Sequence, residues 1–172
     1  MMIRTALLSL AALTLSALTL SGCGFTPVHQ STANGTALQD IVISVEKGDD
    51  VTKNQAGFLL TQRLRDRMGD GGTAPKYRLE ITPDYTRRRL GITDQDVASR
   101  YDISVKAKYR LLDAKTGDQL NRGDVTSIST FGATSGPYGV ITADNVGVEQ
   151  ASQETADKLI RELARYFARQ NG

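Results

Sequence analysis

Residues 101–111 carry the pattern that most restricts how this chain can fold. Apolar side chains alternate there with polar or charged ones. The apolar positions are Tyr101, Ile103, Val105, Ala107, Tyr109 and Leu111, and the polar ones are Asp102, Ser104, Lys106, Lys108 and Arg110. Because successive side chains of a strand point to opposite faces, the pattern predicts one long strand that is buried on a single face. Such a strand needs neighbouring strands beside it and a second layer over its apolar side.

Shorter patterns before and after this strand predict the other elements. Alternation predicts strands over 38–45, from Tyr77 onward and over 119–131, the last of them kinked near Gly123. Apolar residues at helical spacing predict one helix up to Met68 and a second from Val148 to Phe167. Residues 131–145, rich in Gly, Ser and Thr, are predicted to form a loop.

Local signals predict where several of these elements begin and end. Thr52 and Gln55 have the spacing of a capping box, and Gly69 is placed to end the first helix in a left-handed conformation. The stretch 113–118 predicts a hairpin turn in which Gly117 adopts a positive φ. Pro83 cannot donate a hydrogen bond to a neighbouring strand, so we expect it at a sheet edge or a bulge.

The order of these elements, β-α-β-β-β-α, predicts the fold class. The helix between the first two strands predicts a right-handed crossover, and the last three strands predict an antiparallel meander. We therefore expect an α+β two-layer sandwich. It has a four-stranded, mostly antiparallel sheet covered on one face by two helices.

The N-terminal stretch indicates export and lipidation. A basic flank at Arg4 and an apolar run from Ala6 to Leu20 precede Leu20-Ser21-Gly22-Cys23, and this order is typical of a secretory signal. Leu-Ser-Gly-Cys resembles the lipobox of bacterial lipoproteins, whose cysteine is lipidated and becomes the first mature residue. We expect a signal peptide over 1–22, a lipidated tether over 23–37 and a single α/β domain over 38–172. The alternative is an ordinary secreted protein with a cysteine near its cleavage site.

Composition narrows the function classes further. Cys23 is the only cysteine, so the fold is predicted to hold without a disulfide. Without Arg4, 20 of the 21 Lys and Arg face 19 Asp and Glu, a balance that gives no general attraction to nucleic acid. His29, the one histidine, lies in the tether, and no nucleophile motif or cluster of metal ligands occurs. We expect no enzyme activity, no metal and no cofactor.

Two basic clusters are the candidate binding residues. Arg87, Arg88 and Arg89 form the denser one, and the irregularity expected after Pro83 predicts a loop or twisted hairpin end where all three converge. They either bind a phosphate or anionic lipid or are a solvated turn. Lys106, Lys108 and Arg110 form a second row on the polar face of the long strand. For this row a solvated face is the simpler interpretation.

Several stretches together resemble the LptE family of lipopolysaccharide-assembly lipoproteins. They are Cys23-Gly24-Phe25 with Pro27, Arg87-Arg88-Arg89-Leu90-Gly91-Ile92, Arg100 leading into Tyr101-Asp102-Ile103-Ser104-Val105, and Leu159-Ile160 with Leu163-Ala164. The stretch at 87–92 is similar to the branch of that family with short chains. Family members have no catalytic signature and share a layout of tether, strand, helix and late helix.

The resemblance implies a role and partners. LptE-like proteins plug the β-barrel of LptD, help it assemble and pass lipopolysaccharide to the cell surface, and contact lipopolysaccharide through basic side chains. Gly24 after the cysteine, in place of Asp, implies sorting to the outer membrane. Two other classes remain open: a ligand-binding auxiliary lipoprotein of a lipid transporter, and a structural envelope lipoprotein that touches peptidoglycan.

Overall fold

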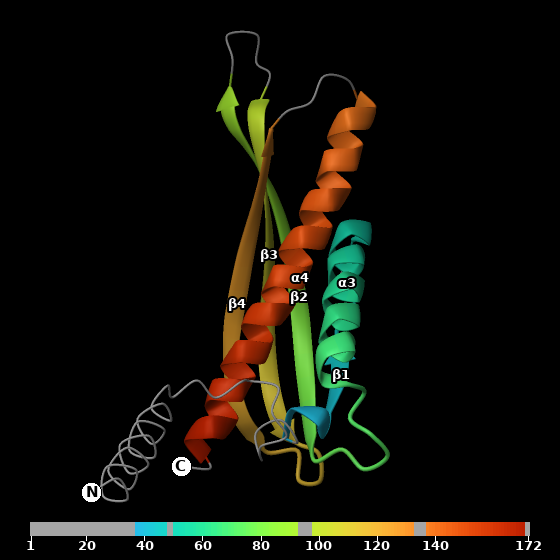
Figure 1. Cartoon of the computed structure of the whole chain (residues 1–172), viewed down its shortest axis with the longest axis vertical. Helices are drawn as coiled ribbons and strands as arrows, with labels where there is room; N and C mark the ends of the chain where they lie inside the picture. Colours follow the sequence, from blue (N-terminus) through green and yellow to red (C-terminus); the bar gives the residue numbers. More distant parts are fainter. Residues whose placement is uncertain (1–36, 48–49, 93–97, 133–136, 171–172) are drawn as a thin grey trace, which may run out of the picture. The chain divides into compact units, whose positions relative to one another are not determined.

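The computed structural model describes residues 37–47, 50–92, 98–132 and 137–170, which belong to one compact unit (Figure 1). The elements are β1 (Ile41–Val45), α3 (Val51–Met68), β2 (Tyr77–Ile92), β3 (Ala98–Asp113), β4 (Gln119–Gly132) and α4 (Pro137–Gln170). The predicted order of strands and helices is confirmed. The predicted signal peptide, Cys23 and nearly all of the tether lie outside the described residues.

The four strands form one sheet in the order β1-β2-β3-β4. β1 runs parallel to β2, and the other two pairs are antiparallel. α3 lies between β1 and β2 in sequence and returns the chain to the same end of the sheet, which a parallel pair requires. β1 pairs only with residues 77–81, so no other strand of the described ranges pairs with the edge of β2 from Thr82 onward. Pro83 lies on that edge, as predicted.

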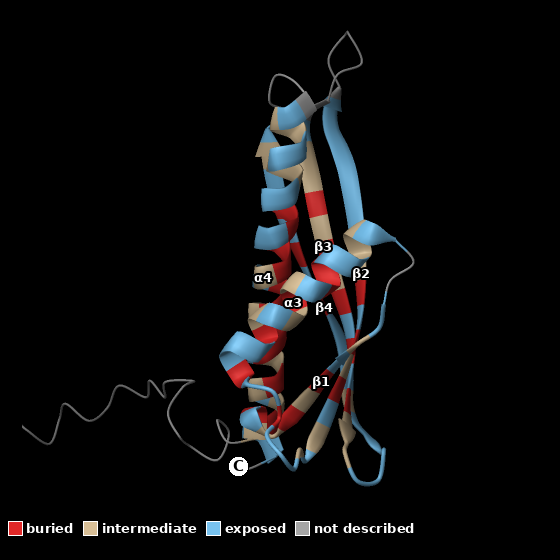
Figure 2. Cartoon of the chain, turned by 90° about the vertical axis from the view of Figure 1, so that its right-hand side faces the viewer, coloured by how far each residue is buried: buried red, intermediate tan, exposed pale blue. Residues whose placement is uncertain are grey.

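Both helices cover the same face of the sheet, which confirms the predicted fold class (Figure 1). α3 packs against β1 and β2, and α4 packs against β3 and β4. Figure 2 shows that buried residues gather where the helices and the sheet face each other. The alternation in 101–111 holds, because Ile103, Val105 and Leu111 are fully buried.

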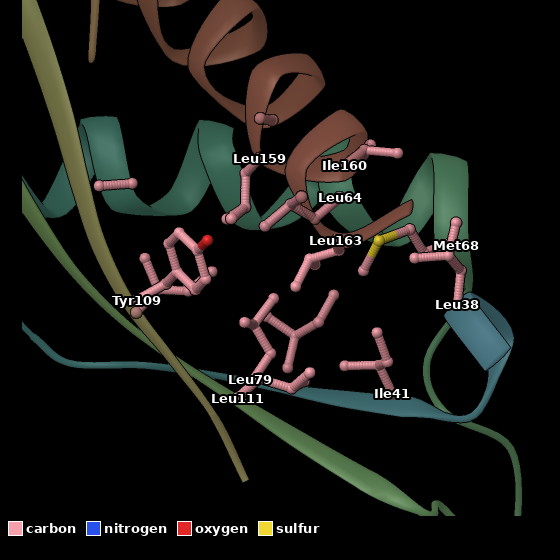
Figure 3. Packing of buried hydrophobic residues seen from close by; sticks show 14 of the residues in the cluster. Leu38, Ile41, Leu64, Met68, Leu79, Tyr109, Leu111, Leu159, Ile160 and Leu163 are labelled. Carbon is pink, nitrogen blue, oxygen red and sulfur yellow. The ribbon is translucent and has the colours of Figure 1, made fainter. Parts of the chain in front are cut away.

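The larger of two clusters of buried residues, the main core, fills the space beneath both helices. Its side chains come from all four strands and both helices, with Val125 contributed by β4. Figure 3 labels ten of them: Leu38, Ile41, Leu64, Met68, Leu79, Tyr109, Leu111, Leu159, Ile160 and Leu163. Burying one such aliphatic side chain stabilises the fold by roughly 1.5–3 kcal/mol. The main core is therefore the chief source of stability.

The smaller cluster, the upper core, lies beneath the earlier part of α4. It consists of Ala56, Ile103, Val105, Val148 and Ala151. Its side chains are smaller, and α4 comes close to the sheet there. A Cβ on Gly147 would lie 3.1 Å from Ile103 and 3.3 Å from Phe131. A larger residue at position 147 would therefore require the Ile103 and Phe131 side chains to shift by a few tenths of an ångström.

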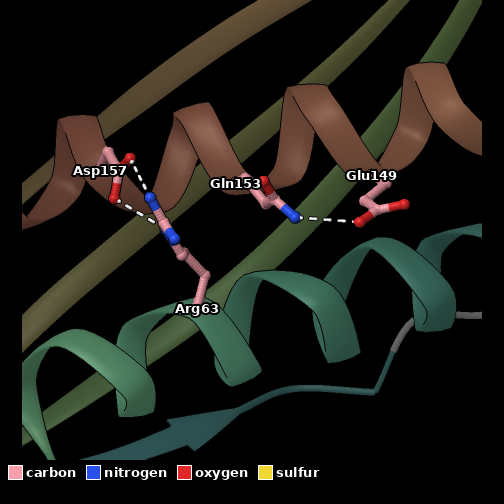
Figure 4. Close-up of polar contacts among 4 residues, drawn as sticks. All are labelled: Arg63, Glu149, Gln153 and Asp157. Atoms are coloured by element: carbon pink, nitrogen blue, oxygen red, sulfur yellow. Dashed lines mark hydrogen bonds and ion pairs between the residues drawn. The ribbon is translucent and has the colours of Figure 1, made fainter.

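Polar contacts join the two helices. The Arg63 guanidinium on α3 donates two hydrogen bonds to the Asp157 carboxylate on α4, of 3.1 and 2.9 Å (Figure 4). The same face of α4 carries an amide contact in which Gln153 donates to Glu149 at 3.1 Å. The hydrogen bonds from Arg63 lower the pKa of Asp157. They hold α3 and α4 together at the exposed rim of their interface.

Two predicted helix boundaries were wrong. α4 begins at Pro137, whereas the sequence predicted a loop over 131–145. Proline is a loop signal in the interior of a pattern, but its fixed φ and missing N–H are tolerated in the first turn of a helix. The cap of α3 is Asp50, whose Oδ1 accepts from the Thr52 N–H at 2.6 Å, so the predicted capping box at Thr52 is not formed.

Other local predictions were confirmed or need a small shift. Gly69 ends α3 with a positive φ of 88°, but its ψ of −172° differs from the predicted left-handed helical conformation. Gly117 has φ 77° in the hairpin turn, as predicted. The irregularity of β4 was predicted near Gly123 but lies opposite Leu111 and Leu112, where the pairing register shifts. Gly123 instead leaves room for the Tyr109 side chain, because a Cβ at position 123 would lie 2.9 Å from the Tyr109 hydroxyl.

Candidate functional site

The sheet face turned away from α3 and α4, here called the open face, is left uncovered by both helices (Figure 1). Register and alternation assign its residues. On the three long strands they include Arg78, Glu80, Thr82, Asp84, Thr86 and Arg88; Arg100, Asp102, Ser104, Lys106, Lys108 and Arg110; and Arg122, Asp124, Thr126, Ile128 and Thr130. All of these but Ile128 are polar or charged, and Leu90 is a further exposed apolar residue on this face. A sheet with one such face is the expected form of an antiparallel layer that meets water or a polar partner.

Ion pairs cross the strands of the open face. Lys106 Nζ lies 3.0 Å from Asp124 Oδ2 on β4, and Arg110 Nη2 lies 2.7 Å from Glu80 Oε2 on β2. Lys108, between them on β3, makes no ion pair with another described residue. The three predicted basic residues therefore share one face, as expected, and Lys108 is the one left available to a partner.

Hydroxyl groups and a shallow hollow add to the polar character of this face. Thr82 donates to Glu46 at 2.8 Å, and Thr130 donates to Asp102 at 2.6 Å. A hollow of about 460 Å³ is lined by polar residues that include Ser44, Glu46, Glu80, Lys108 and Arg110. Its lining includes both acidic and basic side chains, so the hollow is neither uniformly positive nor uniformly negative.

The arginine cluster does not form the predicted loop. Arg87, Arg88 and Arg89 lie inside β2 and pair with Ile103, Asp102 and Tyr101 of β3. Alternation therefore divides them between the two faces. Arg88 lies on the open face, and Arg87 and Arg89 lie on the helix side. The prediction that all three converge on one head group was wrong, because the strand continues past Pro83 without a break.

The Arg87 side chain interacts with other residues of the fold. Its Nε lies 3.4 Å from Asp144 Oδ1 on α4, and its guanidinium lies 4.4 Å from the centre of the Tyr101 ring. Tyr101 in turn stacks on Phe131 of β4, with the ring centres 5.4 Å apart. Burial raises the pKa of the neighbouring Tyr85 hydroxyl, with a further contribution from Asp144. Arg87 thus fastens the first turns of α4 to the sheet.

All three arginines are exposed, but Arg88 and Arg89 make no ion pair with any described side chain. The structure adds Arg100, which lies opposite Leu90 on the open face near Arg88. It also adds Ile128, whose side chain is 57% exposed on that face. The sequence held a signal for Ile128, because it and the buried Val125 fall on opposite faces of β4.

Two further features are absent from the described part of the chain. No group of three His, Cys, Asp or Glu side chains there is placed to hold a metal ion. No helix in the same ranges combines the length and apolar character that crossing a membrane requires.

Comparison with known proteins identifies the family. The profile of the LptE family, described as lipopolysaccharide-assembly, matches residues 41–170, from the start of β1 to the end of α4. The chain belongs to the LptE family. LptE proteins are non-enzymatic lipoproteins of the cell envelope that act in lipopolysaccharide assembly. No protein of curated function gives a significant sequence match.

Solved structures share the fold of this LptE-family chain. A candidate lipoprotein from Caulobacter crescentus is 27% identical, with a TM-score of 0.66, and the match covers 81% of this chain and 98% of that one. Rare lipoprotein B from Shewanella oneidensis is 12% identical, with a TM-score of 0.56 and coverage of 77% and 98%. A minor lipoprotein from Acinetobacter baumannii is 10% identical, with a TM-score of 0.54 and coverage of 74% and 92%.

Proposed function

We propose that this protein is an outer-membrane lipoprotein that plugs an LptD-like β-barrel, helps it assemble and aids delivery of lipopolysaccharide to the cell surface. Residues 1–22 direct export, lipid on Cys23 anchors the chain, and residues 23–37 connect that anchor to the domain. Membership of a lipopolysaccharide-assembly family supports the general role. The open face supports the plug.

The uncovered, polar face of the sheet is the observation on which the plug proposal rests. The interior of an outer-membrane barrel is polar, so a plug must present polar surface to it. The open face does so over three long strands, and two of its ion pairs, Lys106–Asp124 and Arg110–Glu80, already fix side chains in place. Lys108, Arg88 and Arg100 remain available for acidic groups of a barrel wall.

The same proposal includes a contact with lipopolysaccharide, but it involves fewer arginines than the sequence suggested. Arg87 is engaged by Asp144 and Tyr101, so Arg88 and Arg89 are the members of the cluster free to bind lipid A phosphates. Arginine suits such oxyanions because its guanidinium donates two parallel hydrogen bonds. The double variant Arg88→Gln/Arg89→Gln should weaken lipopolysaccharide binding more at low salt than at high salt. Unchanged binding at both salt concentrations would remove lipopolysaccharide contact from the proposal.

Crosslinking in outer membranes tests the barrel partnership. A photocrosslinker at Lys106 or Arg88 should trap one large barrel protein, and Gln62 on the outward side of α3 is the matched control position. Co-purification from detergent-solubilised outer membrane should recover the same barrel. Crosslinks only to peptidoglycan or to an inner-membrane transporter would overturn the plug and favour one of the other two lipoprotein classes. Cys23→Ser should abolish the mature outer-membrane form, as membrane fractionation would show.

A further inference from the structure

The outer edge of β4 is a second surface that the fold leaves unpaired. β4 is the last strand of the sheet that the described residues form, so one of its sides has no neighbouring strand from that part of the chain. The Ile81 carbonyl accepts a hydrogen bond from the Glu46 N–H, so the backbone groups of Ile81 point toward β1. The backbone groups of every second residue of β2 then point the same way, and those of the residues between them point toward β3. Through the pairing registers, this direction determines which residues of β3 and then of β4 bond to their neighbouring strand. In β4 the N–H and C=O groups of Ile128 and Thr130 point away from β3, out of the sheet.

An independent contact confirms this direction. The Thr126 carbonyl, two residues before Ile128, accepts a hydrogen bond of 2.9 Å from Lys158 Nζ on α4. A bond from a helix side chain can reach that oxygen only if it points away from β3. Lys158 therefore covers the edge at Thr126, whereas no contact of this kind covers Ile128 or Thr130 among the described residues.

A hollow of about 530 Å³ lies beside this uncovered stretch, between the end of β4 and the first turns of α4. Its lining carries no charged side chain and includes Phe131, Tyr138, Thr142, Ala143, Val146 and Gly147. Tyr138 is 85% exposed and Val146 is 56% exposed, so apolar surface is left without cover. Ser129, on the floor of the hollow, contacts Gln150 at 3.1 Å, which marks the end nearer the upper core.

The other free edge of the sheet is protected, and this contrast is informative. On β2 above β1, Pro83 has no N–H, and the Tyr85 N–H donates to the Asp84 carboxylate at 3.0 Å. Proline and charged side chains are the usual means by which natural sheets block unwanted strand pairing. Residues 128–132 of β4, Ile-Ser-Thr-Phe-Gly, contain neither. This stretch has the composition of a strand that accepts a partner.

We propose that an extended, uncharged segment of the barrel partner adds to β4 as a fifth strand at residues 128–132, with its apolar side chains in the hollow beside α4. This inference rests on the proposed function and names a contact within it. The unpaired N–H and C=O groups of β4 can hydrogen-bond to the backbone of an added strand, and the uncharged lining of the hollow fits apolar side chains at alternate positions of that strand. A strand inside a closed barrel has no free edge, so the segment is a loop or a terminal stretch. The open face adjoins this edge, so one partner can cover both.

Crosslinking from Tyr138 tests the fifth strand. In the complex purified from outer membranes, a photocrosslinker at Tyr138 should mark one short peptide of the barrel protein. Ile128→Pro removes an outward N–H without breaking a bond to β3, and it should reduce that crosslink about tenfold, equivalent to roughly 1.4 kcal/mol. Ile128→Thr keeps the N–H and is the matched control, in which the crosslink should persist. Val146→Glu places a charge in the hollow without altering the backbone and should reduce the crosslink as well.

The outcomes separate this proposal from the function on which it rests. Crosslinks to lipopolysaccharide or to a second copy of this chain would overturn strand addition, as would a crosslink that Ile128→Pro and Val146→Glu leave unchanged. In those cases the barrel still co-purifies and the plug proposal stands. If the unaltered chain recovers no barrel at all, the plug proposal fails and strand addition fails with it. A melting curve for each variant shows that the fold is intact.

Discussion

The main core and the upper core lie beneath the same helix but are built from different kinds of side chain. The main core consists of Leu, Ile, Met, Phe and other large apolar residues contributed by both helices and all four strands. The upper core is a smaller cluster of one Ile, two Val and two Ala. Buried hydroxyls lie beside it on β4 and α4: Ser127, Ser129, Ser152 and Thr155. Large side chains bury more apolar area, so the main core supplies most of the stability.

The difference extends to the surfaces around each core. Near the upper core lie the exposed apolar residues Ile128, Tyr138 and Val146 and the edge of β4 that no strand covers. Near the main core, β1 adds a fourth strand and α3 completes the covering layer. One end of the domain is thus organised for stability, and the other keeps surface available for a partner.

The largest expected effect is in the main core. Leu163→Ala should lower the free energy of unfolding by about 3 kcal/mol, because Leu163 is fully buried and its removal leaves a cavity. The matched change Leu59→Ala should cost only about 1 kcal/mol, because Leu59 is partly buried against the upper core. Chemical denaturation of the two purified variants measures both. Equal losses would show that the two cores contribute alike.

A smaller effect is expected where α3 meets α4 at the rim of their interface. Asp157→Asn should lower the free energy of unfolding by about 1.5 kcal/mol at neutral pH, because Arg63 donates two hydrogen bonds to this carboxylate. The folded pKa of Asp157 is lowered, so its contribution is complete above the ordinary Asp value of about 3.9. It is then lost as pH falls through the folded value. The gap between Asp157→Asn and the unaltered protein should close in acid, and a constant gap would contradict the assignment.

The next smaller effect is expected for Arg87→Gln, which is compared with Arg88→Gln on the opposite face of β2. Arg87 contacts Asp144 and the Tyr101 ring, so its replacement should cost about 1 kcal/mol of stability. Arg88→Gln, one residue along and exposed on the open face, should change stability by no more than about 0.5 kcal/mol. Thermal melting distinguishes the two. If Arg88→Gln proves the more destabilising, the division of the cluster between the two faces is wrong.

Much of the fold could be predicted because alternation and helical spacing report burial directly. Residues 101–111 predicted β3 and its two faces, and the positions of Gly69 and Gly117 predicted the ends of α3 and of the hairpin. The start of α4 was missed because Pro137 and the glycines near it are loop signals locally. In the structure Pro137 occupies the first turn of α4, where its fixed φ and missing N–H are tolerated.

The candidate site was harder to predict, because it depends on which strands adjoin. Sequence alone placed Lys106, Lys108 and Arg110 on one face, but it could not show that Asp124 and Glu80 pair with two of them. Arg87 was grouped with its neighbours because its partner, Asp144, is far away in sequence. The open edge of β4 has no sequence signal of its own, since it exists only once β4 is known to be the last strand.

The smallest expected effect is a gain in stability beside the upper core. The Ser127 and Ser152 hydroxyls are buried without a hydrogen-bond partner among the described residues. Thr155, by contrast, donates to backbone carbonyls of Ala151 and Val105. A buried hydroxyl without a partner carries an uncompensated desolvation cost, so Ser152→Ala should raise the free energy of unfolding by roughly 0.5–1 kcal/mol. Thr155→Val, which removes a bonded hydroxyl of similar size, is the control and should destabilise. If Ser152→Ala destabilises as well, its hydroxyl has a partner in solution, and the polar residues beside the upper core contribute to stability as the main core does.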